Sequence, residues 1–385
     1  MIYLDYNATT PCDPRVIEEM LPFFREIFAN PSSLHRPGQE ARQAVEKARS
    51  SIAHFIGAKE EEIIFTSGGT ESNNLAIRGV AQALRKRGTH VVTSTIEHHA
   101  VLNVFRALEK EGFSVTYLPV DRDGIVHPEE LRKALRPDTI LVSIMHANNE
   151  TGVIEPIADL ARIAHEGGAV FHTDAVQTVG KVPIDVNALG VDLLAASAHK
   201  FYGPKGVGFL YVRKGTPLAP QILGGRHERG KRAGTENVPG IIGMAKACEI
   251  AAQEMEEETQ RVGELRDTLE KELEQSIPDI SVVGRGAPRL YNTSLILVAY
   301  VEGESLLLNL DFEGICVSSG SACTSSSLEP SHVLLAHGYS HELAHGSIRF
   351  SLGKWTTREE ISQVVTVFPR VVEKLRAISP FWSRR

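Results

Sequence analysis

The feature that most constrains the fold is a long alternation of strand-like and helix-like segments between residues 62 and 213. Short apolar runs bounded by turn residues indicate strands, and the stretches between them carry apolar residues at helical spacing. Such alternation predicts a mainly parallel sheet covered by helices. Strands are expected at 62–66, 90–95, 114–119, 139–146, 169–173, 191–196 and 207–213, and helices at 72–86, 128–135 and 157–165.

Polar side chains gather at the ends of these strands. In an open parallel sheet the carboxyl ends of the strands meet at one edge, which is where ligands bind. Any one of these residues alone would be an ordinary structural polar group, but eight on one edge are not easily explained by capping. They are Thr70, His98, Asn149, Asp174, Gln177, Ser197, His199 and Lys200.

Lys200 follows the strand at 191–196 and precedes a loop rich in glycine. An isolated lysine there would be a solvated surface residue, but Ser197 and His199 offer hydrogen-bond donors beside it. A lysine with a lowered pKa forms Schiff bases, and pyridoxal phosphate (PLP) is its commonest aldehyde partner. A PLP site also needs a carboxylate against the pyridine nitrogen, which Asp174 could supply, and His98 could stack on the ring.

The segment Ser67-Gly68-Gly69-Thr70-Glu71 lies between an expected strand and an expected helix. The first N–H groups of a helix lack internal partners, so this arrangement suits an anion such as a phosphate. The alternative is an ordinary turn with Thr70 as the cap of the helix.

Composition excludes several classes of protein. A net charge of −7, with no block of Lys and Arg, argues against a nucleic-acid partner. No apolar run is long enough to span a membrane, and the N-terminus has no secretory signal. The four cysteines show no CxxC spacing, so neither a disulfide framework nor a zinc ribbon is expected. These features predict a cytoplasmic protein in a reducing compartment.

Beyond the alternating region the pattern changes. Residues 224–237 form a loop rich in glycine and arginine, and 241–276 form a long helix whose Glu-rich face is read as solvated. From residue 280 an α+β pattern is expected, with strands at 290–298, 314–317 and 347–351 and helices at 304–311, 329–336 and 358–379.

Motifs along essentially the whole chain resemble those of fold-type-I PLP enzymes of the class-V aminotransferase family. The sequence is most similar to the group I cysteine desulfurases, the NifS/IscS branch. SSGSAC at 318–323 is the most specific motif of this branch. The others include YLDYNATTP at 3–11, FTSGGTESNN at 65–74, EHHAVL at 97–102, NNETG at 148–152, HTDAVQTVGKVPID at 172–185, AHKFYGPKGVG at 198–208, HERGKRAGTENVPGIIG at 227–243 and SIRFSLG at 347–353.

The resemblance implies the α/β fold of aspartate aminotransferase-like PLP-dependent transferases. Its large domain, expected at 15–250, holds a mainly parallel seven-stranded sheet and the PLP. A smaller α+β domain is expected from 1–14 and 251–385, and it carries the catalytic-cysteine loop at about 317–328.

The resemblance also implies a role for each candidate residue. Lys200 would carry PLP and move the substrate Cα proton, His98 would stack on the ring and assist proton transfer, and Cys323 would be the nucleophile. Substrate would be bound by Asn7, Asn149 and Arg349, of which Arg349 would hold the carboxylate. The residues expected to bind the cofactor are Gly69, Thr70, His98, Asn149, Asp174, Gln177, Ser197, Ala198, His199, Lys200 and, from the other subunit of a homodimer, Thr235.

The chemistry of the cysteines agrees with this assignment. Cys323 lies in a run of Ser, Gly and Thr that contains few apolar residues, so its thiol is expected to be exposed and able to ionise. A free cysteine is more often a small buried apolar residue, and that reading is expected for Cys248 and Cys316.

The resemblance implies that the enzyme removes sulfur from L-cysteine, releasing L-alanine and leaving a persulfide on Cys323. The persulfide would pass to an IscU/NifU-like scaffold protein or another acceptor for iron–sulfur cluster assembly. Two alternatives stay open: a selenocysteine lyase or another PLP-dependent transferase, and a non-catalytic platform for cluster assembly.

One motif matches the pattern of an unrelated class of enzyme, the zinc proteases. Residues 341–345 read HELAH and match the zinc-protease pattern HExxH, which requires a continuous helix. Glycine at 338 and 346 makes a long helix there unexpected, so no metal site belonging to this chain is predicted. Whether Cys323 transiently binds an iron–sulfur cluster shared with a scaffold protein is left open.

Overall fold

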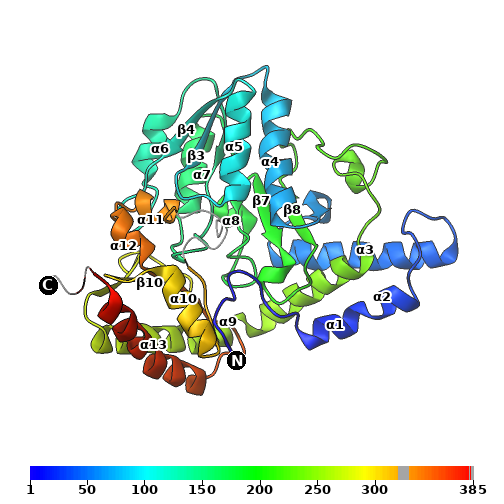
Figure 1. Cartoon of the computed structure of the whole chain (residues 1–385). Helices are drawn as coiled ribbons and strands as arrows, with labels where there is room; N and C mark the ends of the chain where they lie inside the picture. The colour runs from blue at the N-terminus through cyan, green and yellow to red at the C-terminus, as the bar shows by residue number, and fades with distance from the viewer. Residues whose placement is uncertain (320–328, 381, 383–385) are drawn as a thin grey trace.

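The computed structural model describes residues 1–319, 329–380 and 382, and it contains two layered parts (Figure 1). The larger part is built on a seven-stranded sheet with strand order β2-β8-β7-β6-β5-β3-β4. All neighbouring strands are parallel except β8, which is antiparallel to both β2 and β7. The prediction of a mainly parallel sheet is confirmed. The strands are β2 (Ile63–Thr66), β3 (His90–Ser94), β4 (Ser114–Leu118), β5 (Thr139–Ser143), β6 (Val170–Asp174), β7 (Leu193–Ser197) and β8 (Gly208–Val212).

Both faces of the sheet are covered, and every residue of β3, β5 and β7 is buried. In β7, Leu193 and Ala195 face one apolar cluster, whereas Leu194 and Ala196 face the other, as the two-residue period of a strand requires. Helices α4 (Gly69–Leu84) and α5 (His99–Lys110) cover the first face. The second face is covered by α3 (Arg36–Phe55), α6 (Pro128–Ala134), α7 (Ile157–Glu166) and the first half of α9 (Val238–Ser276).

The smaller part has its own apolar cluster. Its three-stranded antiparallel sheet has the order β12-β10-β9, and a short parallel pair, β1 with β11, lies beside it. The elements are β1 (Ile2–Tyr3), β9 (Ile280–Val282), β10 (Thr293–Val298), α10 (Gly303–Phe312), β11 (Ile315–Cys316), α11 (His332–Ala336), α12 (His341–His345), β12 (Ser347–Ser351) and α13 (Arg358–Ile378).

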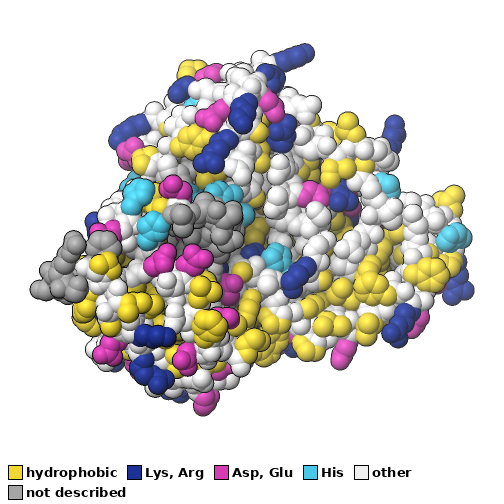
Figure 2. Space-filling view, in the orientation of Figure 1, with side chains coloured by type: hydrophobic (Ala, Val, Ile, Leu, Met, Phe, Trp, Pro, Cys, Tyr) yellow, Lys and Arg dark blue, Asp and Glu magenta, His cyan; other side chains and the backbone are white. Residues whose placement is uncertain are grey.

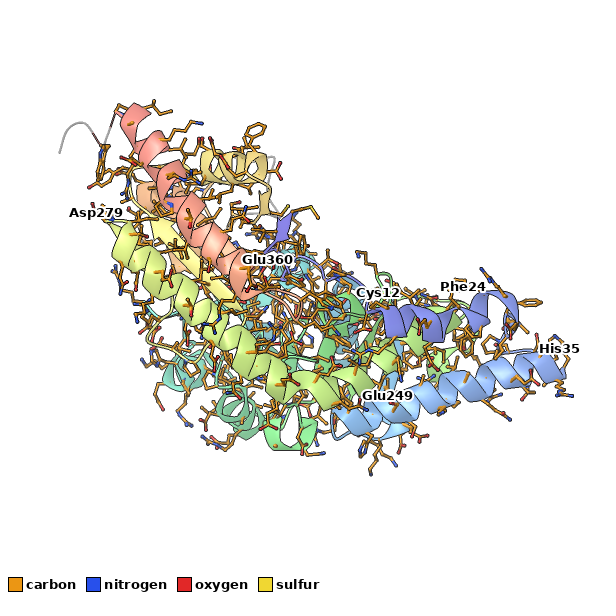
Figure 3. The ribbon with its side chains drawn as sticks, turned by 90° about the horizontal axis from the view of Figure 1, so that it is seen from below. Cys12, Phe24, His35, Glu249, Asp279 and Glu360 are labelled. Carbon is orange, nitrogen blue, oxygen red and sulfur yellow. The ribbon has the colours of Figure 1, made fainter. Side chains whose placement is uncertain are left out.

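Helix α9 connects the two parts. Its residues up to Ile250 pack in the core of the larger part, and those from Val262 onward pack in the core of the smaller part. Figure 3 shows α9 running past Glu249 toward Asp279, with α13 alongside its second half and α3 beside its first half. The N-terminal helices α1 (Pro14–Met20) and α2 (Pro22–Arg25) lie at the end near His35.

Some predicted boundaries are wrong. Helix α4 begins at Gly69, three residues before the predicted start at Ser72, because the glycine turn itself continues into the helix. Helix α11 begins at His332 instead of residue 329, with Ser331 as its N-cap. Helix α5, the short helix α8 (Val186–Leu189) and strand β9 were not predicted.

Among the described residues, no helix combines the length and the apolar character needed to cross a bilayer.

Candidate active site

A cavity of about 620 Å³ lies at the edge where the strands of the large sheet end. All eight polar residues predicted to converge there line it, so that prediction is confirmed: Thr70, His98, Asn149, Asp174, Gln177, Ser197, His199 and Lys200. Asn7, Gly69 and Arg349 line it as well. Its volume suits a small cofactor together with a small substrate.

Lys200 reaches the cavity from the turn Ala198–Lys200, which directly follows β7. Its Nζ donates to the carbonyl oxygens of Asn7, at 2.6 Å, and Ala8, at 2.9 Å. The N-terminal segment therefore forms the wall against which this amine rests.

Asp174 ends β6 and is 6% exposed. Its Oδ2 accepts a hydrogen bond from Asn73 Nδ2 at 2.6 Å, and its Oδ1 accepts one from the Val176 N–H at 3.0 Å. Two donors from different elements thus fix the plane of the carboxylate at the cavity wall.

His98 is the N-cap of α5, and its Nδ1 accepts from the N–H of Ala100 at 3.1 Å. A neutral ring must therefore carry its proton on Nε2. Burial lowers the pKa of His98, while the charge of Asp174 opposes that effect and the charge of Lys200 adds to it. A neutral imidazole can lie against an aromatic ring and accept or return a proton.

The N-terminus of α4 opens onto the cavity. Its N-cap residue Gly68 has a φ of 148° and gives the helix no side-chain cap, so the alternative of a turn capped by Thr70 is wrong. A Cβ on Gly69 would come within 2.5 Å of Val176 Cγ2. Any other residue there would force Val176 to move, and the first N–H groups of the helix are left for an anion.

His199 also lines the cavity, and Thr9 contacts its ring. The His199 Nδ1 and the Thr9 Oγ1 lie 3.1 Å apart. Burial, with the nearby charge of Lys200, lowers the pKa of His199 to about 4. At neutral pH the ring is uncharged and one of its nitrogens carries a proton that can be donated.

Arg349 enters from β12 of the smaller part. Its Nη1 donates to the carbonyl of Asn149 at 2.9 Å, and its Nη2 pairs with Asp5 Oδ1 at 2.7 Å. Its buried Nε has no hydrogen-bond partner among the described residues. The guanidinium is thus held by residues of the larger part and the N-terminus while one N–H stays available.

Two predicted site residues do not line the cavity, and a third lies outside the described residues. Ala198 is fully buried, and its N–H donates to the carbonyl of Val207, so neither its methyl nor its amide faces the cavity. Thr235 is exposed on the loop before α9. Cys323 lies outside the described residues. Of the other cysteines, Cys248 is buried as predicted, whereas Cys316 is only half-buried.

Sequence reasoning missed several polar residues of the site. Asn73 lies on the cavity side of α4 and is 1% exposed. Ser331 lines the cavity and donates to the buried carboxyl group of Glu150, whose pKa burial raises to about 7. The signal was present, because both Asn73 and Glu150 are polar residues within motifs that had been singled out at strand ends.

Residues 341–345, which match the zinc-protease pattern, form the five-residue helix α12. Across the ranges that the structure describes, no group of three or more His, Cys, Asp or Glu side chains could hold a metal ion.

Comparison with known proteins agrees with this geometry. The sequence model of the family described as aminotransferase class-V matches residues 2–364. Cysteine desulfurase IscS of Dictyoglomus turgidum is 61% identical over 380 residues, which cover 99% of this chain and 96% of the relative. The chain belongs to the cysteine desulfurase family. A second member, cysteine desulfurase IscS of Methanosarcina thermophila, is 53% identical over 98% of this chain and 94% of the relative.

Solved structures of the family have the same fold. A NifS-like protein aligns with a TM-score of 0.91 at 42% identity, covering 97% of this chain and all of the other. The NifS-like protein of Rickettsia africae aligns with a TM-score of 0.88 at 34% identity, covering 97% and 99% of the two chains. Cysteine desulfurases of this class depend on PLP.

The residues of the cavity fit that cofactor. A buried carboxylate, Asp174, suits the protonated pyridine nitrogen, and the amine of Lys200 suits the aldehyde. The uncapped N-terminus of α4 at Gly69, with Thr70 and Ser197 beside it, suits the phosphate.

Proposed function

We propose that this protein is a PLP-dependent cysteine desulfurase that transfers the sulfur of L-cysteine to Cys323 and releases L-alanine. The observation that carries the proposal is the convergence of Lys200, Asp174 and Arg349 on one cavity. These groups supply the amine for the aldehyde, the anion for the ring nitrogen and a cation for the substrate carboxylate. Identity of 61% to a cysteine desulfurase over 99% of the chain supports the choice of substrate.

Each residue has a task that follows from its chemistry. When bound, PLP withdraws electrons from the substrate carbons and so makes the sulfur open to attack. Asp174 keeps the ring nitrogen protonated, and Arg349 orients the substrate through its carboxylate. Lys200 takes the proton from Cα and can return it, and neutral His98 is placed to assist these transfers.

The sulfur-transfer step belongs to Cys323. Its thiolate attacks the substrate sulfur, a sulfur–sulfur bond forms, and the carbon–sulfur bond breaks. The electron pair of the broken bond stays with the carbon, which gains a proton and leaves as alanine. Glu329, the first described residue after Cys323 in the chain, lines the cavity, which supports this assignment.

We also propose a homodimer in which Thr235 of one subunit contacts the cofactor phosphate of the other. Thr235 is exposed and absent from the cavity of its own chain. Large apolar side chains are exposed on two segments: the loop that precedes Thr235, and α2 with the segment that follows it. They are Ile222 and Leu223 on the first, and Phe24, Phe28 and Leu34 on the second. Figure 2 shows apolar side chains extending over the surface around α1 and α2. Exposed apolar surface of this kind marks interfaces.

The persulfide would supply an iron–sulfur scaffold protein of the IscU/NifU kind in the cytoplasm. The name shared by the relatives supports this role. The described cysteines Cys12, Cys248 and Cys316 are all free, as expected in a reducing compartment.

Borohydride reduction followed by peptide mapping tests the cofactor assignment. A pyridoxyl group is expected on the peptide containing Lys200; a protein that acts only as an assembly platform would show none. A sulfide and alanine assay with L-cysteine, run on the wild type and on Cys323→Ser, tests the reaction. The substituted protein should lose desulfuration. A selenocysteine lyase that works without a persulfide would keep its activity after this change.

A further inference from the structure

Lys181 is a buried lysine close behind the cavity wall. It lies in the turn after β6, where its N–H donates to the carbonyl of Thr178, and it is 5% exposed. Among the residues that the structure describes, no carboxylate lies within salt-bridge distance of its Nζ. Burying a cation without an anionic partner is costly, which makes a purely structural role for this side chain unexpected.

Two amide oxygens surround the amine of Lys181. Its Nζ donates to Gln177 Oε1 at 2.9 Å and to Asn7 Oδ1 at 3.3 Å. An ammonium group can only donate hydrogen bonds. Lys181 therefore turns the oxygen of each amide toward itself, and each NH₂ group must point away from it.

The NH₂ groups point toward the cavity side of the network. Gln177 Nε2 donates to the carbonyl of Asn7 at 3.0 Å, and the same carbonyl accepts from Lys200 Nζ at 2.6 Å. Asn7 Nδ2 donates to the carbonyl of Asn149 at 3.2 Å. Asn7 is also oriented by other partners, because its Oδ1 accepts from Asn292 Nδ2 at 3.1 Å and its Nδ2 donates to Thr293 Oγ1 at 2.8 Å. For the Gln177 amide, in contrast, a residue without contact to the cavity fixes the position of the oxygen.

We propose that Lys181 is a positioning residue that holds the Gln177 amide with its NH₂ group toward the cavity, so that the ring oxygen of the cofactor meets a hydrogen-bond donor. This inference rests on the proposed function, because it requires PLP in this cavity. A donor stabilises the ring oxygen as an anion, whereas a flipped amide would present an oxygen and destabilise that anion.

Other charges also face Lys181. Burial, together with the charges of Lys200 and Arg349, lowers the pKa of Lys181 to about 7, and the charge of Glu258 opposes this effect. A neutral lysine amine keeps two N–H groups, enough to donate to both amide oxygens, so the same arrangement of Gln177 is available above this pH. The test must nevertheless separate a positioning effect from the direct effect of charge on Lys200.

The test measures the visible absorption of the bound cofactor as a function of pH. The pH at the midpoint of the absorbance change reports the proton affinity of the cofactor ring together with Lys200. Lys181→Met removes the donor at similar volume and should raise this midpoint by about one pH unit, a tenfold increase in proton affinity. The same Lys181→Met change is then made in a protein that already carries Gln177→Ala. There it should raise the midpoint by less than about a third of the shift seen with Gln177 present, because the effects of two residues that act together are not additive. An equal shift in both backgrounds, or no shift in the first, overturns the proposal.

Two further variants keep the test decisive. Gln177→Glu leaves Lys181 intact and presents only acceptors, so it should raise the midpoint even if Lys181→Met does not fold; an unchanged midpoint overturns the proposal. Lys205→Met removes an exposed positive charge near His199 and should leave the midpoint in place; a shift as large as that of Lys181→Met also overturns it. A wild-type protein that binds no PLP would contradict the proposed function instead.

Discussion

Asn73 Nδ2 donates a hydrogen bond of 2.6 Å to Asp174 Oδ2 at the cavity wall. The two residues come from α4 and β6, so the contact joins the element that offers its N-terminus to the phosphate with the strand that ends in the carboxylate. The cofactor's two charged ends are therefore expected to be placed by one rigid unit.

Asn73→Ala removes that contact and should weaken PLP binding. The buried carboxylate loses one of its two donors, and hydrogen bonds to charged groups contribute about 1.5 to 3 kcal/mol. We expect the Kd for PLP to rise by roughly ten- to a hundredfold, measured by fluorescence titration of the apoprotein. Asn74→Ala is the matched control, because Asn74 bonds the carbonyl of Thr70 in its own helix and its loss should change the Kd by less than about twofold. Equal effects of the two variants would contradict the role given to Asn73.

Arg349→Lys should impair binding of L-cysteine more than turnover. Lysine keeps the charge but loses the planar fork that can hold a carboxylate while bonding Asp5 and the carbonyl of Asn149. We expect KM to rise by about tenfold or more with a smaller change in kcat, measured from alanine release. Arg370→Lys, on an exposed arginine that does not line the cavity, should leave both constants within about twofold. A fall in kcat with an unchanged KM would mean that Arg349 does not hold the substrate.

Glu155→Gln should change the pH dependence of stability. Burial raises the pKa of Glu155 to about 8, well above its ordinary value of about 4.3. Between these values the folded protein keeps a proton that the unfolded chain has released, so stability falls as pH rises. Glutamine removes this contribution and can still accept from the N–H of Val126, which bonds Glu155 Oε2 at 2.8 Å.

We therefore expect Glu155→Gln to gain stability relative to wild type by roughly 1 to 3 kcal/mol between about pH 5 and pH 8. Urea unfolding at several pH values measures this difference. Exposed Glu129→Gln serves as the control and should give a difference that does not vary with pH. A Glu155→Gln difference that is constant across the range would show that this carboxyl is ionised in the folded protein.

Glu228→Gln should destabilise the fold near the loop that carries Thr235. Arg49 Nη1 and Nη2 pair with Glu228 at 2.8 and 2.9 Å, and both side chains are buried. Removing one partner of a buried pair leaves an uncompensated charge, which costs about 3 to 5 kcal/mol. Glu40→Ala breaks the exposed pair with Arg36 on the same helix and should cost less than about 1 kcal/mol. Comparable losses in urea unfolding would contradict the burial of the first pair.

The sequence predicted those parts of the fold that depend on the spacing of apolar residues and on the position of turn residues such as glycine and proline. The buried strand β7 and the long helix α9 were found because their apolar patterns are continuous. Helix α5 was missed because it begins directly after His98, a residue interpreted only as a ligand-binding group, although it is also the cap of the helix. Strand β9 has three half-buried residues, too few for a periodic signal.

The candidate site shows a similar division. Residues that follow strands, such as Asp174 and Lys200, could be predicted because a parallel sheet brings strand ends together. The residues that support them, Asn73 and Lys181, act across tertiary contacts between segments far apart in sequence. Asn73 stands in a motif that the sequence analysis quotes, but these pairings themselves join distant segments and leave no local pattern, so they became visible only in the structure.

Mass mapping of the protein after a single turnover with L-cysteine tests the central claim most directly. The sample is alkylated under non-reducing conditions, and each cysteine peptide is weighed alongside the alanine released. We predict that the peptide containing Cys323 gains the mass of one sulfur atom in proportion to alanine, while peptides of Cys12, Cys248 and Cys316 do not. Alanine released with no added sulfur on Cys323, or with the sulfur on another cysteine, would contradict the proposed transfer.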